Sequence, residues 1–549
     1  MAERRTLERR IRRAFRDHLG FDEPQPGQLQ AVRALLEGRD TLAVMPTGAG
    51  KSAIYQAAGA LLRGATVVLS PLIALQRDQA ESIRETSAGE ARALNSSLAE
   101  RDQVRVLDDL EAGRIEFLLL APEQLVRSEV RERLARIRPS LFVVDEAHCI
   151  SDWGHDFRPE YLQLPDAVEA LGRPAIVGLT ATAAPPVRAE IAERLRMRDP
   201  AVVVRGFDRP NIRLGVDTFT DEASKRRALV EHVGRAAEPG IVYAATRRRA
   251  EEIAELLRDA GIDAAAYHAG LRSAERHDVH EAFMEGRTPV VVATTAFGMG
   301  IDKPNVRFVF HADAPDSLDA YYQEFGRAGR DGQGAEARLF FRPEDLGLRR
   351  FFAASGQVDP AEVRRVAEVV HEHDAPLPAA DLREEVDLSQ TKLAAALGRL
   401  ADTGLVELRP DGEVAPAGRE PSERDLTRAA KAAVEADERH RALDESRIEM
   451  LRGYAETREC RRRYILNYFG EEAPARCGRC DTCESGISTA EEDEPRRPFE
   501  LGATVRHRSF GDGQVVRYEG ERVVVRFEQV GYKSLVAERA RQRGILRAG

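Results

Sequence analysis

The 549-residue sequence contains no long apolar run. Runs such as residues 117–121 fall far short of the roughly 20 residues that a membrane-spanning helix needs. The first residues, Met-Ala-Glu-Arg-Arg, also lack the apolar core of a secretion signal. Both absences favour an intracellular protein, and we expect it in the cytoplasm, associated with the nucleoid if the source is bacterial.

The chain also lacks the basic excess that is common among nucleic-acid-binding domains, because its formal net charge is -10. This argues against a protein that coats DNA passively. A motor needs only a local basic track, which the net charge does not reveal. The proportions of hydrophobic (43%) and charged (32%) residues are those of a globular protein, and the length predicts about three to five domains.

Cysteine is scarce, with five residues, and four of them fall between positions 460 and 483. This is not the usage of a disulfide scaffold and points instead to a metal. The spacing Cys-x16-Cys-x2-Cys-x2-Cys predicts a tetrahedral zinc site made by Cys460, Cys477, Cys480 and Cys483. An iron–sulfur cluster uses the same ligands, and absorbance at about 400 nm would distinguish it.

A glycine-rich turn follows a short apolar run at Thr41–Val44, which predicts a buried strand, and precedes a helical pattern. Strand, glycine-rich turn and helix together cradle the phosphates of a nucleotide. Lys51 would supply positive charge and Ser52 a hydroxyl group for Mg²⁺, although Met45 stands where the general motif has glycine. The candidate nucleotide-binding residues of the turn are Thr47, Gly48, Gly50, Lys51 and Ser52.

A second apolar strand, predicted at residues 140–144, ends in Asp145-Glu146-Ala147-His148. Parallel α/β sheets bind ligands at the carboxyl ends of their strands. We therefore expect Asp145 to hold Mg²⁺ together with Ser52, and Glu146 to orient and deprotonate the attacking water. A solvated acidic loop is the alternative, and the phosphate-binding pattern earlier in the chain argues against it.

The turn Pro-Thr-Gly-x-Gly-Lys-Ser resembles that of superfamily 2 helicases, and residues 149–161 resemble the aromatic-rich loop of RecQ helicases. Trp153, the only tryptophan in the chain, lies there in a polar segment. It can stack on single-stranded bases while Arg158 meets phosphate, or it can plug the loop onto the core together with Phe157. The resemblance implies DNA contact or coupling by His148, Trp153, His155, Phe157 and Arg158.

Other motifs follow the RecQ order. Residues 19–28 resemble the adenine-recognition motif, which implies that Gln28 reads the base, although Gln25 stands where the family usually has arginine. Residues 70–72 and 178–183 resemble the motifs that contact DNA and couple the lobes, and they implicate Thr180 and Thr182.

Residues 207–212 resemble the RecQ linker between two lobes, and the strands predicted at 240–244, 264–267 and 290–294 alternate with helices, which predicts a second parallel sheet. Residues 294–302 resemble the motif in which Thr294 touches DNA and Asp302 the ribose. Residues 323–332 resemble the motif in which Arg327 and Arg330 reach the γ-phosphate across the cleft.

Residues 356–420 have the helix–turn–helix–hairpin pattern of a winged helix, with a turn at residues 410–412. Such modules bind duplex DNA or pack domains together, and both interpretations stay open. RecQ proteins usually carry this module after the zinc module, whereas here it comes first. Beyond a linker at 486–497, alternating apolar residues at 498–549 resemble the Tudor-like tail of UvrD-type helicases, which docks on RNA polymerase.

The expected fold is α/β: two RecA-like parallel-sheet lobes (1–207 and 208–350), a winged-helix-like segment (356–420), a helical zinc module (422–485) and a small SH3/Tudor-like β-barrel (498–549). The RecQ resemblance implies a 3′ to 5′ DNA helicase of repair and recombination that uses ATP, Mg²⁺ and Zn²⁺. Its partners would be single-stranded and duplex or forked DNA, with RNA polymerase or repair proteins at the barrel. The alternatives are a DNA-dependent translocase that does not unwind, and a DNA-binding regulator with a vestigial motor.

Overall fold

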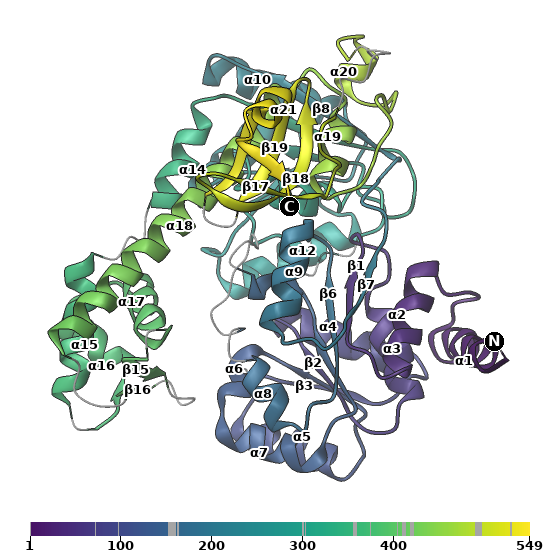
Figure 1. The fold of residues 1–549 in the computed structure, drawn as a ribbon. Coiled ribbons are helices and arrows are strands. Elements are labelled where there is room, and N and C mark those ends of the chain that lie inside the picture. Colours follow the sequence, from purple (N-terminus) through teal and green to yellow (C-terminus); the bar gives the residue numbers. More distant parts are fainter. Residues whose placement is uncertain are drawn as a thin grey trace.

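The computed structural model describes residues 2–71, 73–96, 98–151, 161, 164–298, 301, 303–354, 359–373, 375–402, 404–408, 413–417, 422–488, 497–527 and 530–549. Two sheet-centred lobes form the body of the molecule, and a helical module, a cysteine-rich module and a C-terminal sheet complete it (Figure 1). Among these residues, no helix has the length and hydropathy that crossing a bilayer requires.

The first lobe is built on a parallel sheet in the order β3-β4-β2-β5-β6-β1-β7. Helices cover both faces, because Phe117 and Leu119 of β4 belong to one apolar cluster and Leu118 and Leu120 to another. Strands buried on both faces need continuous apolar runs, which explains the sequence pattern. The strands are β1 (Thr41–Val44), β2 (Thr66–Leu69), β3 (Ala91–Leu94), β4 (Phe117–Leu120), β5 (Leu141–Val144), β6 (Ala175–Thr180) and β7 (Ala201–Val204). The helices are α1 (Ala2–Leu19), α2 (Pro26–Leu36), α3 (Ser52–Leu61), α4 (Ile73–Arg84), α5 (Glu100–Glu111), α6 (Pro122–Val126), α7 (Ser128–Ile137), η1 (Ala147–Ile150), α8 (Leu164–Ala170) and α9 (Pro185–Arg194).

The second lobe repeats this architecture with a parallel sheet in the order β10-β11-β9-β12-β13-β8. The two parallel sheets confirm the α/β fold class expected from the sequence. The strands are β8 (Ile212–Thr218), β9 (Gly240–Tyr243), β10 (Ala264–Tyr267), β11 (Val290–Ala293), β12 (Phe308–His311) and β13 (Ala335–Phe341). The helices are α10 (Glu222–Arg235), α11 (Arg247–Asp259), α12 (Ser273–Glu285), α13 (Leu318–Phe325) and α14 (Asp345–Ala354).

The helical module has the element order of a winged helix. The predicted helix pair corresponds to α16 (Ala379–Val386) and α17 (Gln390–Asp402), followed by β15 (Val406–Leu408) and β16 (Glu413–Pro416). These strands form an antiparallel sheet with β14 (Leu377–Pro378), in the order β14-β16-β15. An earlier helix, α15 (Pro360–Glu372), was not predicted. The predicted turn at 410–412 lies outside the described residues.

The helix α18 (Glu423–Glu456) leads from this module to the rest of the molecule, and Figure 1 shows the module standing beside the lobes. With 34 residues and about 1.5 Å of rise per residue, the helix is about 50 Å long. Leu426 packs into the winged-helix core, whereas Leu451 and Tyr454 pack into the cluster that also holds the lobes. The helix therefore spans the distance between two separate cores.

The cysteine-rich module follows, with α19 (Arg461–Tyr468) and α20 (Asp481–Glu484). It touches both lobes at their junction. Phe469 stacks on Phe207 of the interlobe segment with ring centroids 4.3 Å apart, and Arg188 of α9 donates a hydrogen bond to the Phe469 carbonyl at 2.7 Å. Tyr468 also donates a hydrogen bond to Asp319 of α13.

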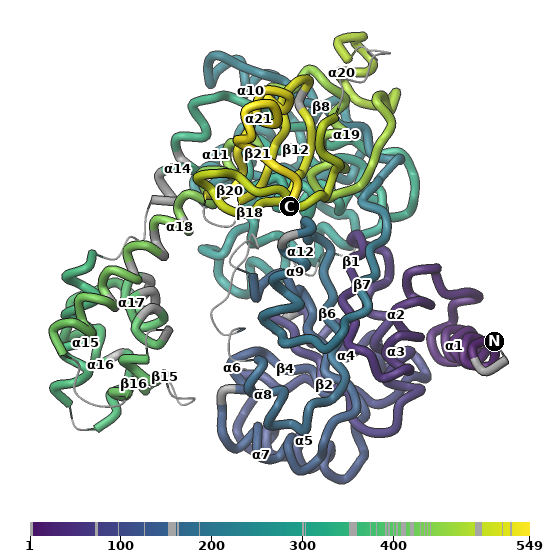
Figure 2. Tube along the Cα trace, viewed as in Figure 1, coloured from purple at the N-terminus to yellow at the C-terminus, as the bar shows by residue number. Residues whose placement is uncertain are grey.

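The C-terminal sheet is antiparallel in the order β20-β19-β18-β17-β21. Its elements are β17 (Thr504–His507), β18 (Gly511–Glu519), β19 (Arg522–Phe527), β20 (Gly531–Val536), α21 (Ala537–Gln542) and β21 (Leu546–Ala548). The alternation in β19 predicted one buried face, yet the strand is buried from Val523 to Phe527. The second face packs on α18 and α19, so the C-terminal sheet lies against the cysteine-rich module (Figure 2).

Candidate nucleotide, zinc and DNA-binding sites

The predicted phosphate loop lies between β1 and α3, at the carboxyl edge of the first sheet. Gly48 and Gly50 adopt φ angles of +83° and +67°, which residues with a β-carbon rarely tolerate. The Lys51 ammonium group donates a hydrogen bond across the loop to the Met45 carbonyl at 3.3 Å. The loop therefore turns back on itself at the start of α3, where backbone N–H groups and a cation converge as an anion requires.

Gln28 is buried behind this loop rather than in an open base pocket. Its amide nitrogen donates to the carbonyls of Ala49 and Gly50 at 3.1 and 3.0 Å, and its amide oxygen accepts from the Gln25 N–H at 2.9 Å. In this conformation Gln28 supports the phosphate loop, and its expected contact with the base stays a prediction.

The carboxylates of Asp145 and Glu146 follow β5, next to the loop. Burial and the neighbouring Glu146 raise the pKa of Asp145 to about 6. Burial lowers the pKa of Lys51, which the two carboxylates oppose. Buried carboxylates beside a partly desolvated ammonium group are a donor set that a divalent cation and phosphate oxygens would stabilise, so these residues fit Mg²⁺ and a nucleotide.

Glu146 has a φ angle of +47°, an unfavourable conformation for a residue with a side chain. This geometry brings its carboxylate within 3.3 Å of His148 Nδ1. The same ring nitrogen lies 3.0 Å from the Thr180 hydroxyl group, which donates to the Thr182 carbonyl at 3.1 Å. A buried chain of contacts therefore runs from the acidic pair to the segment that leads into α9.

Gln79 of α4 donates a hydrogen bond to the Asp145 carboxylate at 2.8 Å. Gln79 was not predicted, because nothing in the local sequence pattern distinguishes a glutamine that faces the site from one that faces solvent. A glutamine 66 positions before its partner could be found only from the packing of α4 on the sheet, where α4 contacts β3 and β4.

The predicted arginine pair lies in the turn after α13, and its members have different surroundings. Arg330 packs across the cleft against Gly48, since a β-carbon built there would lie 3.6 Å from the Arg330 Cγ atom. Arg327 is buried within the second lobe, where a β-carbon on Gly298 would lie 3.3 Å from its guanidinium group. Of the two, Arg330 is the one that meets the phosphate loop.

The interlobe segment holds this arginine turn in place. Arg209 donates to the carbonyls of Gly326 and Ala328, both at 2.7 Å. Asn211 donates to the Gly329 carbonyl at 2.7 Å. The linker signature was recognised in the sequence, but this positioning role for its polar residues was not.

The four clustered cysteines come together as predicted, with their sulfur atoms within 4.8 Å of one another. The sulfurs of Cys460 and Cys480 are 4.0 Å apart. Thiolates bound at about 2.3 Å around a tetrahedral zinc ion lie about 3.8 Å from one another, so the cluster fits zinc.

Several predicted DNA-coupling residues lie outside the described part of the chain: Trp153, His155, Phe157 and Arg158. Asp302 does as well. Thr294 is described at the end of β11, where its N–H donates to the Tyr267 carbonyl at 3.2 Å. The structure therefore tests none of the expected DNA contacts of the aromatic loop.

Comparison with known proteins decides the family. Family models described as DEAD/DEAH box helicase, helicase conserved C-terminal domain and RecQ zinc-binding match residues 25–190, 224–332 and 423–484. The probable ATP-dependent DNA helicase RecS of Bacillus subtilis is 37% identical over 369 residues, covering 66% of this chain and 74% of the relative. The chain belongs to the RecQ family of DNA helicases.

Other RecQ relatives are covered less completely. The RecQ helicase of Pasteurella multocida is 43% identical over 327 residues, which are 59% of this chain and 51% of the relative. The RecQ helicase of Bacillus subtilis is 33% identical over 469 residues, covering 85% of this chain and 65% of the relative. This chain therefore spans between half and three quarters of the length of these relatives.

Solved structures support the fold alone. Dbp5 of S. cerevisiae bound to RNA and ADP BeF3 matches with a TM-score of 0.51 and 21% identity, covering 62% of this chain and 90% of that one. The DUF1998 helicase MrfA bound to DNA matches with a TM-score of 0.52 and 18% identity, covering 76% of this chain and 63% of that one.

The RecQ zinc-binding match contains all four cysteines, and it confirms the prediction of a zinc cofactor. The assignment of these four cysteines as the zinc ligands stays a prediction that their sulfur cluster supports.

Proposed function

We propose that this chain is an ATP-dependent DNA helicase that moves 3′ to 5′ on single-stranded DNA and separates duplexes in repair and recombination. The observation that carries the proposal is the reach of Arg330 from the second lobe to Gly48 in the phosphate loop of the first. Lys51 and the acidic pair lie on the other side of the same cleft. Because these groups belong to different lobes, hydrolysis depends on cleft closure, which is how a two-lobed motor couples chemistry to movement.

The roles of the individual residues belong to this proposal. Thr47, Gly48, Gly50, Lys51 and Ser52 hold the phosphates, and Ser52 and Asp145 hold Mg²⁺. Gln28 and Asp302 contact the base and the ribose, Glu146 positions and deprotonates water, and Arg327 supports Arg330. When bound, ATP and Mg²⁺ supply a transferable phosphoryl group and a cation that neutralises its charge.

We assign DNA coupling to His148, Thr180, Thr182 and Thr294 and to the aromatic loop. The contacts from Glu146 through His148 to Thr180 support a route from the hydrolysis site toward α9. Trp153→Ala should leave DNA binding largely intact yet abolish most of the stimulation of ATP hydrolysis by DNA. If the variant retains full stimulation, the role proposed for this loop is wrong.

Strand displacement on a forked substrate with a 3′ tail tests the main proposal. Wild-type protein should separate the strands with ATP, and Lys51→Ala should lose both unwinding and DNA-stimulated hydrolysis. Hydrolysis without displacement would favour a translocase that remodels nucleoprotein complexes. If the protein binds DNA but Lys51→Ala does not reduce ATP hydrolysis, the result would favour a regulator with a vestigial motor.

The module boundaries are likewise proposals: lobes at 1–207 and 208–350, a winged-helix-like module at 356–420, a zinc module at 422–485, a linker at 486–497 and the C-terminal sheet at 498–549. Association with the nucleoid and docking of RNA polymerase or a repair protein on the C-terminal sheet belong to the same proposal. Exposed Arg508, Arg543 and Arg547 offer a basic surface for such a partner. The test is whether the whole chain captures RNA polymerase. If it does not, while a control protein that binds polymerase does, RNA polymerase is excluded as that partner.

A further inference from the structure

Tyr468, on α19 of the cysteine-rich module, reaches into the second lobe. Its hydroxyl group donates a hydrogen bond to the carboxylate of Asp319, which lies in the first turn of α13. Both residues are buried, with exposed fractions of 2% and 5%, so little water competes for this bond to a carboxylate. Because α13 ends at Phe325, directly before the arginine turn, the cysteine-rich module contacts the helix that leads to Arg330.

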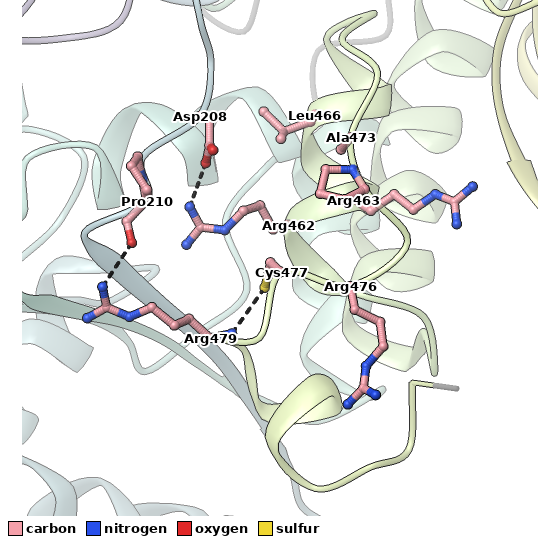
Figure 3. Close-up of a pocket in the computed structure, with 10 residues that line it drawn as sticks. Asp208, Pro210, Arg462, Arg463, Leu466, Ala473, Arg476, Cys477 and Arg479 are labelled. Atoms are coloured by element: carbon pink, nitrogen blue, oxygen red, sulfur yellow. Dashed lines mark hydrogen bonds and ion pairs between the residues drawn. The ribbon is translucent and has the colours of Figure 1, made fainter. Parts of the chain in front are cut away.

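The helix α19 is itself fixed in place, so Tyr468 contacts α13 from a firm support. At its start, α19 follows Cys460, one of the four clustered cysteines. Arg462 points toward the interlobe segment (Figure 3), where it donates to the Asp208 carboxylate at 2.5 Å and to the Ile212 carbonyl at 2.6 Å. The helix is therefore anchored to the cysteine cluster and to the segment between the lobes before it meets α13.

The first lobe also acts on Asp319. Burial raises the pKa of this carboxylate, whereas the hydrogen bond from Tyr468 and the charges of Arg447 and His148 lower it. His148 belongs to the acidic segment after β5, where its ring nitrogen lies 3.3 Å from the Glu146 carboxylate. Asp319 therefore lies at the meeting point of the second lobe, the cysteine-rich module and the hydrolysis site.

We propose that Tyr468 and Asp319 are positioning residues for ATP hydrolysis, a role that rests on the helicase function proposed above. Their hydrogen bond holds the first turn of α13, whereas Arg209 of the interlobe segment holds the turn beyond its last residue. The helix and the arginine turn are thus fixed at both ends, with Arg330 against the phosphate loop. Because a group that acts on a phosphoryl transfer must be placed precisely, loss of one hold should slow hydrolysis although every phosphate-binding residue is unchanged.

Tyr468→Phe tests this role, and Tyr464→Phe is its matched control on the same helix. Both variants remove one buried hydroxyl group and keep the ring. The Tyr464 hydroxyl group donates to the Met450 carbonyl at 2.7 Å and accepts from Arg517 at 2.6 Å, and both partners lie outside the second lobe. The two variants therefore separate the contact with α13 from the general loss of a buried hydrogen bond.

The measurement compares two affinities in the presence of Mg²⁺ and single-stranded DNA: that for labelled ADP with aluminium fluoride, and that for labelled ADP alone. Aluminium fluoride mimics the phosphoryl group in transfer, so a well-placed arginine strengthens the first affinity and not the second. Y468F should bind ADP with aluminium fluoride about tenfold more weakly than wild type, and ADP alone within about twofold. Y464F should match wild type in both affinities.

Equal behaviour of Y468F and Y464F, with wild type binding the aluminium fluoride complex, overturns the positioning role and leaves the helicase proposal standing. If wild type neither hydrolyses ATP nor binds that complex, both proposals are wrong. Each variant is also assayed for bound zinc, because loss of the metal is a competing cause of a weaker affinity.

Asp319→Ala removes the same hydrogen bond from the second lobe and leaves the cysteine-rich module unaltered, so it keeps the test decisive if Y468F loses zinc. It should weaken the binding of ADP with aluminium fluoride at least as much as Y468F does. The double variant Y468F/D319A should be no weaker than D319A, because the bond is already lost. Additive losses would mean that the two residues act separately, which contradicts the proposal.

Hydrogen exchange distinguishes displacement of the arginine turn from unfolding of the lobe. In Y468F, the backbone N–H groups of Gly326, Ala328 and Gly329 should exchange faster than in wild type, whereas those of β9 and β12 should not. Y464F should leave all of them unchanged. Faster exchange throughout the second lobe of Y468F would mean that Tyr468 only stabilises the fold, and the positioning role would then be wrong.

Discussion

The winged-helix-like module and the C-terminal sheet are attached to the motor in opposite ways. All buried residues of the first module's core lie between Val363 and Leu426. The C-terminal sheet has its own core too, but Val516 and Val524 on its other face belong to the cluster that contains both lobes. The segment that looks like a terminal tail in the sequence is thus built into the body, whereas the segment in the middle of the chain stands apart on α18.

Charge separates the same two modules. Residues 356–420 contain 14 acidic and 7 basic residues, and residues 498–549 contain 6 acidic and 10 basic residues. An acidic surface repels the DNA backbone, with its charge every 1.7 Å or so, whereas a basic surface attracts it. The winged-helix-like module therefore suits a structural or protein-binding role better than DNA binding, which narrows the choice left open by its sequence.

Removal of zinc should destabilise the C-terminal sheet strongly and leave the winged-helix-like module unchanged. Cys480→Ser breaks a site whose metal contributes on the order of 10 kcal/mol to folding of zinc-dependent modules. Because α19 begins directly after Cys460, its packing against the C-terminal sheet should fail too. Hydrogen exchange should rise sharply in β18 and β19 and stay unchanged in α15. Cys149→Ala changes a cysteine outside the cluster and should retain zinc. If hydrogen exchange in Cys480→Ser rises equally in the winged-helix-like module and the C-terminal sheet, the two modules are not attached in opposite ways.

Arg517 of the C-terminal sheet contacts Tyr464 of α19 in the cysteine-rich module. Its guanidinium carbon lies 3.4 Å from the centre of the Tyr464 ring, and it donates to the Tyr464 hydroxyl group at 2.6 Å. Arg517→Ala removes a buried cation–π contact and leaves a cavity, so the free energy of unfolding should fall by about 2 to 4 kcal/mol. Arg522 is an exposed arginine of β19, and Arg522→Ala should lower the free energy of unfolding by less than about 1 kcal/mol. Urea titration of both variants measures the two changes. Equal costs would mean that the sheet is only loosely attached.

The parts of the candidate sites that short-range sequence patterns encode were predicted correctly in position. The loop with Lys51 and the acidic pair after β5 follow from apolar runs ended by glycine or carboxylates, and the zinc cluster follows from spacing alone. Helix α15 carried a signal that was missed, because Asp359 and Glu362 form a capping box directly around Pro360.

Long-range contacts had no such signal. The register shift between Val515 and Arg517 is a β-bulge, which re-aims side chains, so strict alternation could not show that Arg517 points toward α19. The contact between Gln79 and Asp145 depends on the packing of α4, and the tie from Arg209 to the arginine turn spans more than 100 positions. These contacts arise from tertiary packing, which the periodicity of a single segment does not describe.

Core disruption of the winged-helix-like module should stay local. Leu382 of α16 is fully buried in that module's core, and Leu382→Ala should destabilise the module by about 2 to 5 kcal/mol. Since the module shares no buried core residue with the described lobes, DNA-stimulated ATP hydrolysis and zinc content should match wild type. Hydrogen exchange of α15 and α17 together with an ATPase assay checks both parts. A parallel loss of hydrolysis would mean that α18 transmits the damage to the motor.

The smallest effect is expected where a winged helix would ordinarily read DNA, on α17. Lys392 of this helix already forms an ion pair with Glu362, at 2.7 and 3.1 Å from its two carboxylate oxygens. Its charge is therefore offset before any DNA approaches, and Lys392→Gln should change DNA affinity less than about twofold, with no change in salt dependence. If Lys392→Gln instead lowers the salt slope by about one, α17 contacts a phosphate, and the acidic module is a DNA-binding element despite its net charge.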